Sequence, residues 1–277
     1  MERLTRPSLE RFAVFRRARR PVVLQGLLNE SERAAYWTLP SLRERFADRV
    51  VSVIPTHEGR ISVDVRTGVE FDTVRFGDYV DALQRGERPP AYIAVPAETW
   101  LPELSDRVGA PLYCRDAAWR NARFWLGAQT AVPLHRDVAE NVFFQLMGHK
   151  RFLLYPPAAS AWLYSNPLRS ALPNFSRFDP EHPDYERFPL SRAVQPVELV
   201  LAPGDALYLP SLWWHQVRAL DVSASLNFWF ADGWLAHLVR AAEVVKRSRG
   251  LEIYGLEARR EVPRSAPGRA VARPPEP

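Results

Sequence analysis

Short runs of aromatic and β-branched residues, separated by Pro and Gly, fill the chain from residue 123 to residue 230. The runs cover residues 124–126, 142–146, 151–155, 197–201, 206–209, 215–219 and 222–230. Many short strands with turn signals between them are typical of a barrel or a sandwich. Within this region Pro203-Gly204-Asp205 predicts a tight turn, because Gly accepts the positive φ that a type II turn requires after Pro. The pattern therefore predicts a mostly β domain with flanking helices.

The segments on either side of this region show other patterns of apolar residues, mixed strand and helix patterns before it and helical spacing after it. Before it, residues 1–122 predict strands at 21–24, 50–54, 61–65 and 91–95 and helices at 39–46 and 76–84. After it, apolar residues recur at helical spacing, and a second short helix is expected over 253–258. These apolar positions are Leu235, Leu238, Val239, Ala242 and Val245. The apolar face of a helix that follows the barrel has to be buried. It can pack on its own barrel or on the same helix of a second copy in a homodimer.

We therefore expect three parts in the chain. Residues 1–122 form a mixed α/β lead-in packed on the core, residues 123–232 form the catalytic barrel, and residues 233–277 form a helical region with a flexible basic tail. Residues 166–190, rich in Pro, Asn, Asp and Ser, are long enough to be an insert between strands. Inserts of this kind often carry substrate contacts.

Composition narrows the class of protein. Hydrophobic residues make up 47% of the 277, which is enough for a buried core, yet no run reaches the ~18 apolar residues that a membrane span needs. The N-terminal residues lack the apolar segment of a secretory signal. A single cysteine, Cys114, excludes an intramolecular disulfide and fits a reducing compartment. We expect a cytoplasmic protein without a membrane partner.

The charge of the chain leaves two interpretations open. The net charge of +5 and the pI near 9.6 could indicate nucleic-acid binding, but basic and acidic residues are mixed along most of the chain. A solvated basic surface is therefore favoured over a tRNA partner. The C-terminal residues are the exception, because they gather arginines between prolines.

His135 and Asp137 stand two positions apart, so on a strand their side chains would leave the same face. One imidazole and one carboxylate are two thirds of a facial triad, the arrangement that leaves positions open on a non-haem iron(II). A third ligand must come from a neighbouring strand, and His215 opens a strand just after the Pro203-Gly204-Asp205 turn. Surface or capping positions are expected for the other histidines, which are His57, His149, His182 and His237.

Three further polar residues fall in or beside apolar strands. Lys150 is one of only two lysines among 37 basic residues, so a compact ammonium is expected to be required at this position in place of a guanidinium fork. An ordinary turn lysine is the alternative. Asn141 and Asn227 are amides in aromatic strands, where burial costs free energy unless the amide has a partner. A bound carboxylate or a metal-bound water would be such a partner.

Taken together, these motifs resemble the JmjC and cupin-like oxygenases, and within them most closely the asparaginyl hydroxylase of hypoxia-inducible factor. The resemblance rests on PLHRDVAENVFFQ at 133–145, GHKR at 148–151, YPP at 155–157, PDYERFP at 183–189, PGDALYLP at 203–210, WWH at 213–215 and NFW at 227–229. It is dense from about residue 124 to residue 230. It implies a double-stranded β-helix, the jelly-roll or cupin-like core, followed by C-terminal helices.

The resemblance also implies a role for each matching residue. His135, Asp137 and His215 would bind Fe(II), and Lys150 would pair with the distal carboxylate of 2-oxoglutarate. Asn141 and Asn227 would lie near the metal-chelating end of this cosubstrate. Tyr92 resembles a tyrosine that bonds the distal carboxylate, and either Tyr92 or Thr130 would replace the Ser or Thr that the family has in place of Val132. Arg136 and Trp229 are expected to line the substrate pocket.

The activity implied by this resemblance is that of a dioxygenase, which consumes O2, decarboxylates 2-oxoglutarate to succinate and hydroxylates a C–H bond. A side chain of a protein or peptide is the favoured substrate. Hydroxylation of a small metabolite or of a modified tRNA base is the alternative enzymatic function. A cupin-like binding protein without catalysis is a third hypothesis, and the complete set of expected ligands argues against it.

Overall fold

The computed structural model describes residues 1–28, 35–101 and 112–248. Its centre is a pair of four-stranded antiparallel sheets that face each other, one in the order β9-β16-β11-β14 and the other in the order β10-β15-β12-β13. The strands are β9 (Trp119–Ala128), β10 (Ala131–Arg136), β11 (Glu140–Met147), β12 (Lys150–Tyr155), β13 (Val197–Leu201), β14 (Ala206–Leu209), β15 (Trp214–Ala219) and β16 (Val222–Ala231). Successive strands mostly alternate between the sheets, which confirms the predicted jelly-roll class.

The N-terminal strands extend this core at both edges. On one side β1 (Arg3–Thr5) pairs with β2 (Val22–Gln25), which pairs with β14. On the other side β8 (Ala91–Pro96) joins β9 to β3 (Val50–His57), and β3 also pairs with β7 (Asp72–Arg75). The short β4 (Arg60–Ile61) links β3 to β10, and β5 (Val63–Asp64) pairs with β6 (Gly68–Val69). The predicted boundary at residue 122 falls inside β9.

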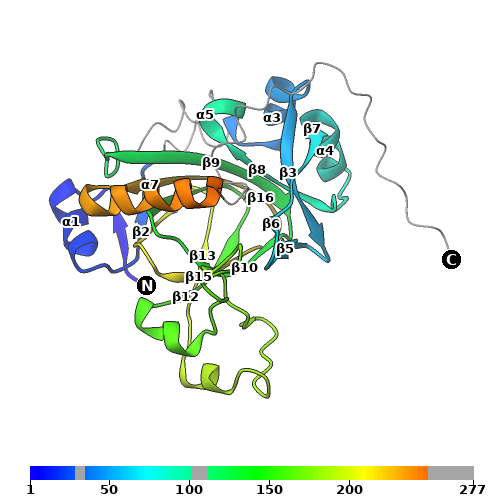
Figure 1. The fold of residues 1–277 in the computed structure, drawn as a ribbon. Coiled ribbons are helices and arrows are strands. Elements are labelled where there is room, and N and C mark those ends of the chain that lie inside the picture. Colours follow the sequence, from blue (N-terminus) through cyan, green and yellow to red (C-terminus); the bar gives the residue numbers. More distant parts are fainter. Residues whose placement is uncertain (29–34, 102–111, 249–277) are drawn as a thin grey trace.

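The sheet with β9, β16, β11 and β14 is the larger of the two, because β1, β2, β8, β3 and β7 extend it, and the other is the smaller sheet. Helices cover the outside of the larger sheet (Figure 1). The predicted helices at 39–46 and 76–84 are α3 (Leu39–Phe46) and α4 (Phe76–Gln84), with the expected bounds. Helix α1 (Leu9–Arg17) was not predicted, although the Ser8 hydroxyl caps it by accepting from the backbone N–H of Arg11. Further helical segments among the described residues are α5 (Ala97–Trp100), α7 (Gly233–Ser248) and the 3₁₀ turns η1 (Pro157–Trp162) and η2 (Pro189–Ala193).

Helix α7 buries one side on its own barrel and exposes the other. Ala236 and Val239 pack against Ala231 of β16, whereas Trp234 and Leu238 are exposed. The homodimer therefore stays a prediction. The second helix expected at 253–258 and the basic tail lie outside the described residues. Within the part of the chain that the structure describes, no helix combines the length and apolar character needed to cross a bilayer.

Strand alternation separates an interior from an exterior on the smaller sheet. On β12, Lys150 is buried while Arg151 is partly exposed, and on β15 the buried His215 lines the interior cavity while Arg218 faces outward. The predicted turn before β14 is present, with Gly204 at φ 97° and the Asp205 N–H donating to the carbonyl of Ala202. Polar side chains of both sheets therefore meet in the space between the two sheets.

Candidate metal centre

The three predicted metal ligands meet at one end of the barrel. His135 and His215 are paired neighbours on β10 and β15, and Asp137 follows β10 directly. Each residue offers one ligand atom, a ring nitrogen or a carboxylate oxygen, and these three atoms all lie within 4.8 Å of one another. The Nε2 atom of His215 is 3.7 Å from Oδ2 of Asp137. Strand pairing thus brings together residues that stand about 80 positions apart in the sequence.

The pairing of β10 with β15 is irregular at this point. Its register shifts between Val132 and His135, as in a β-bulge, and Asp137 lies beyond the last residue of the strand. The backbone N–H of Leu212 donates to the carbonyl of Asp137 at 2.7 Å. His135 and Asp137 both line the cavity, although Asp137 lies one residue beyond the end of the strand.

Backbone carbonyls orient both imidazoles. The Nδ1 atom of His135 is 2.8 Å from the carbonyl oxygen of Pro133, and Nδ1 of His215 is 3.0 Å from that of Trp213. When Nδ1–H donates to a carbonyl, the lone pair of Nε2 is left for a metal ion. The ring of Phe175 also stacks on the ring of His135, with centroids 4.9 Å apart. Each ligand ring is therefore held before any metal binds.

The electrostatics keep His215 neutral. Burial, together with the neighbouring His135, lowers the pKa of His215 to about 4, although Asp137 acts in the opposite direction. A neutral imidazole is the form that binds a metal ion. The carboxylate of Asp137 accepts a hydrogen bond from the Trp229 indole, with Nε1 3.0 Å from Oδ2. Trp229 thus orients a ligand as well as lining the cavity.

Lys150 lies deep in the same cavity. It is 1% exposed, and its Nζ donates to the hydroxyl of Tyr92 at 2.8 Å and to that of Ser225 at 2.6 Å. Among the ion pairs of the described residues none joins Lys150 to a carboxylate. Burial therefore lowers the pKa of Lys150 to about 7. A buried cation without an anion is suited to bind the carboxylate of a ligand.

The two asparagines line this cavity between Lys150 and the histidines. The Trp125 indole donates to Oδ1 of Asn227 at 2.6 Å, so the Asn227 amide is held by the protein. Oδ1 of Asn141 is buried and has no hydrogen-bond partner in the described structure. A buried polar atom of this kind indicates a partner supplied by a ligand. The cavity thus offers a metal site at one end and a carboxylate site at the other.

Two predicted residues do not line the cavity. Thr130 is buried in the turn between β9 and β10, whereas Val132 of β10 lines the cavity. Arg136 points away, because its neighbours on the chain are the inward-facing ligands. Its guanidinium lies 4.7 Å from the ring centre of Trp214 and donates to the hydroxyl of Ser160. Of the expected pocket residues, only Trp229 is a lining residue.

Some site residues were not predicted. Ser225 precedes Asn227 by two positions on β16, so the alternation of that strand could have identified it. Its hydroxyl donates to Oε1 of Gln145 at 3.2 Å. Asn174 and Phe175 line the cavity from the long segment between β12 and β13. That segment was expected to carry substrate contacts, but nothing in its sequence singled out these two residues.

The residues present fit an iron(II) ion with a dicarboxylate. Two neutral imidazoles and one carboxylate form the donor set of non-haem iron(II) sites and leave positions open for further ligands. Lys150, a cation suited to a carboxylate, lines the same cavity as these donors, and the unpaired Oδ1 of Asn141 there can accept from a metal-bound water. The chemistry of the site therefore agrees with the cofactors that the sequence resemblance implied.

Comparison with known proteins supports the same grouping. The family model described as "Cupin-like domain" matches residues 8–233. The chain is 32% identical over 237 residues to "Lysine-specific demethylase 8" of Xenopus tropicalis, which covers 81% of this chain and 51% of that protein. The protein of the same name from Danio rerio is also 32% identical, with coverage of 81% and 57%. "Lysine-specific demethylase JMJ30" of Arabidopsis thaliana is 30% identical over 188 residues, with coverage of 63% and 44%.

The chain thus spans about half the length of the curated relatives it matches. These relatives bear the names of JmjC proteins and lysine demethylases, which confirms the broad resemblance to JmjC and cupin-like oxygenases. The finer likeness to an asparaginyl hydroxylase stays a prediction.

Proposed function

The chain belongs to the cupin-like domain family, and from this premise we propose that it is an iron(II)- and 2-oxoglutarate-dependent oxygenase that hydroxylates a C–H bond in a protein or peptide side chain. JmjC proteins of this kind use Fe(II), 2-oxoglutarate and O2. One observation carries the proposal: the His135, Asp137 and His215 side chains share a cavity with a buried lysine that has no carboxylate partner among the described residues.

In this proposal His135, Asp137 and His215 hold iron(II). The bound iron, with 2-oxoglutarate and O2, supplies the oxidising chemistry, in which the cosubstrate loses carbon dioxide to become succinate and one oxygen atom enters the substrate C–H bond. The protein contributes the geometry. The carbonyls of Pro133 and Trp213 orient the imidazoles, and the Trp229 indole holds Asp137.

Lys150 and the Tyr92 hydroxyl would bind the distal carboxylate of 2-oxoglutarate. The Ser225 hydroxyl accepts a hydrogen bond from Lys150 and donates one to Gln145. These two hydrogen bonds fix the position of the Lys150 ammonium group. Asn141 and Asn227 would contact the other end of the cosubstrate through their amide N–H groups, which can donate to its oxygens. The buried Oδ1 of Asn141 needs a donor, which a metal-bound water can supply and 2-oxoglutarate cannot. Apolar side chains such as Phe143, Leu207 and Val217 complete the lining and exclude water from the reaction.

A lysine side chain in a protein is the first substrate class to test. The support is the relatives described above, which are named as lysine-specific demethylases. Hydroxylation of an N-methyl group releases formaldehyde, whereas hydroxylation of a ring or chain carbon leaves one added oxygen atom in the product. The two outcomes are therefore separable by one analysis.

The test is a peptide array that includes methylated and unmethylated lysine peptides, incubated with the protein, iron(II), 2-oxoglutarate and O2. We expect succinate formation that rises with one class of peptide, together with formaldehyde or a mass increase of one oxygen atom in that peptide. Succinate that rises only with tRNA or with small metabolites would contradict the peptide assignment. A tRNA partner would further show affinity that falls steeply with salt.

A further inference from the structure

The segment between β12 and β13 reaches from the cavity mouth to the outside of the smaller sheet. At the mouth, Phe175 stacks on His135 and forms a bridge with it, and Asn174 lines the cavity. The Asn174 side chain donates to the carbonyl of Arg136, and the Arg136 N–H donates to the carbonyl of Asn174. We call this part, residues 172–175, the mouth segment. It is the wall of the cavity that covers a metal ligand.

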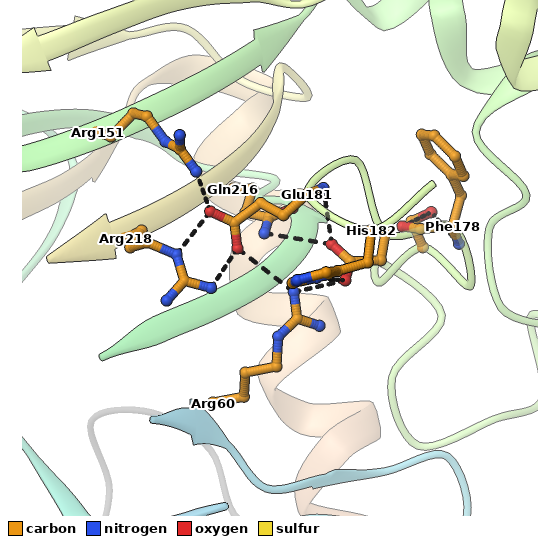
Figure 2. Close-up of polar contacts among 9 residues, drawn as sticks. Arg60, Arg151, Phe178, Glu181, His182, Gln216 and Arg218 are labelled. Carbon is orange, nitrogen blue, oxygen red and sulfur yellow. Dashed lines mark hydrogen bonds and ion pairs between the residues drawn. The ribbon is translucent and has the colours of Figure 1, made fainter. Parts of the chain in front are cut away.

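Outside the sheet, the same segment is held by three arginines (Figure 2). Arg151 and Arg218 both donate to the carboxylate of Glu181, and Arg218 Nε is 2.6 Å from Oε1. Arg60 Nη2 is 2.6 Å from Oδ2 of Asp179 and 3.4 Å from Oε2 of Glu181. These five residues, which we call the arginine clasp, join the segment to β4, β12 and β15.

The charges in the clasp are held ionised. Burial favours a raised pKa for Glu181, yet hydrogen bonds from Arg218 and Arg151 hold that pKa below its usual range. The Glu181 side chain is 5% exposed. Hydrogen bonds between ionised partners are stronger than neutral ones, and losing one partner of a buried pair leaves an uncompensated charge. The clasp is therefore a stronger attachment than a surface ion pair.

The arginine clasp and the cavity lie on opposite faces of β12 and β15. Arg151 directly follows Lys150 on β12, and Arg218 stands three positions after His215 on β15. Asp179 comes only four positions after Phe175. Because so short a stretch of chain cannot extend far, a held Asp179 restricts how far Phe175 can leave His135.

We propose that the arginine clasp is a positioning device that keeps the mouth segment closed over His135 and so slows loss of the metal ion. Glu181 and its arginines act through Phe175 and Asn174 and touch no reacting atom. The proposal rests on the proposed function, since it assumes that the three ligands bind iron(II). The anchoring of the segment itself does not depend on that assumption.

The test compares Glu181→Gln with wild type and with Asp205→Asn. Asp205 is a matched control because it is also a buried carboxylate paired with an arginine, Arg3, at the N-terminal edge of the fold. Two quantities are measured on the full chain. One is the rate of iron(II) transfer to a chelator without oxygen, and the other is the rate of tryptic cleavage after Arg177, an exposed residue between the mouth segment and the clasp.

We expect Glu181→Gln to accelerate both iron(II) release and cleavage after Arg177 by roughly tenfold or more. Both rates should rise in proportion to the population of molecules in which the segment has locally opened. Asp205→Asn should lower the melting temperature but change neither rate by more than about twofold. Arg60→Gln serves as a second variant if Glu181→Gln does not fold, and should accelerate both rates in the same direction.

The proposal would be overturned if folded Glu181→Gln released iron(II) and was cleaved after Arg177 at the same rates as the wild type. Equal acceleration in Asp205→Asn would also overturn it, because the effect would then follow overall stability. If the wild type binds no iron(II), the proposed function fails, and the positioning of the metal site fails with it. Cleavage after Arg177 then still decides whether the clasp anchors the segment.

Discussion

His135 and His215 are directly paired across β10 and β15, and the centres of their rings lie 4.1 Å apart. The two imidazoles would repel each other if both were protonated, and burial already lowers the pKa of His215 to about 4. Neutral imidazoles would instead offer their lone pairs to a metal ion, with the Asp137 carboxylate as the charged ligand. The sheet pairing that defines the fold is therefore the same contact that assembles the metal site.

Replacement of Lys150 should separate cosubstrate binding from metal binding. Lys150→Ala removes the cation of the cavity, so we expect the Kd for 2-oxoglutarate to rise by about 30-fold or more, which corresponds to the ~2–5 kcal/mol lost when a buried charge pair is truncated. The affinity for iron(II) should change little, because Lys150 contacts none of the three ligands. Titration of each ligand without oxygen measures both. An unchanged Kd for 2-oxoglutarate would remove Lys150 from the site.

The affinity for 2-oxoglutarate should depend on pH in a stated direction. Burial lowers the pKa of Lys150 to about 7, so above that pH the empty cavity holds mostly the neutral amine. A bound carboxylate favours the ammonium form and draws a proton from solution. The affinity should therefore fall as pH rises from 7 to 9. Calorimetry in buffers of different ionisation enthalpy should show proton uptake that Lys150→Ala abolishes, and release of protons would contradict the account.

The Trp229 indole should matter for iron(II) binding. Trp229→Phe keeps the aromatic ring but removes the donor to Asp137, and the loss of such an orienting hydrogen bond typically costs about 10- to 100-fold in metal affinity. Trp162→Phe is the control, since Trp162 is 38% exposed on η1 and does not line the cavity. Competition with a metal chelator measures both. Equal affinities for the two variants would show that the hydrogen bond does not hold Asp137.

The exposed side of α7 leads to a prediction about assembly. If a second copy of the chain covers Trp234 and Leu238, the wild type should be a dimer at micromolar concentration, and Trp234→Ser with Leu238→Ser should be a monomer. Leu168→Ser, which changes a leucine that is 84% exposed between β12 and β13, should leave the dimer intact. Sedimentation velocity distinguishes these outcomes. A monomeric wild type would rule out the paired helices.

Local patterns predicted the regular elements well. Helices α3 and α4 match their expected bounds because each has a clear apolar side, and β13 and β14 match because turns flank them. Helix α1 was missed although Ser8 is a good cap and Phe12 and Phe15 are spaced for one face. Its many arginines hid that face in the sequence pattern.

Contacts across the fold were harder to predict. The bulge in β10 depends on its register with β15, which the sequence does not show, whereas the alternation that puts His135 and Asp137 on one face already places Arg136 on the other. Lys150 was identified because its residue type is rare in this chain. Glu181 and its arginines carried no such signal, since Arg60 and Arg151 are ordinary members of an arginine-rich sequence.

The central claim is that two imidazoles and one carboxylate share an iron(II) ion beside a bound 2-oxoglutarate. The most direct measurement is the visible absorption of the purified protein, mixed without oxygen with iron(II) and 2-oxoglutarate. We expect the weak charge-transfer band of that chelate in the wild type and its loss in His215→Ala. A wild type without the band, or a folded His215→Ala that keeps it, would contradict the account.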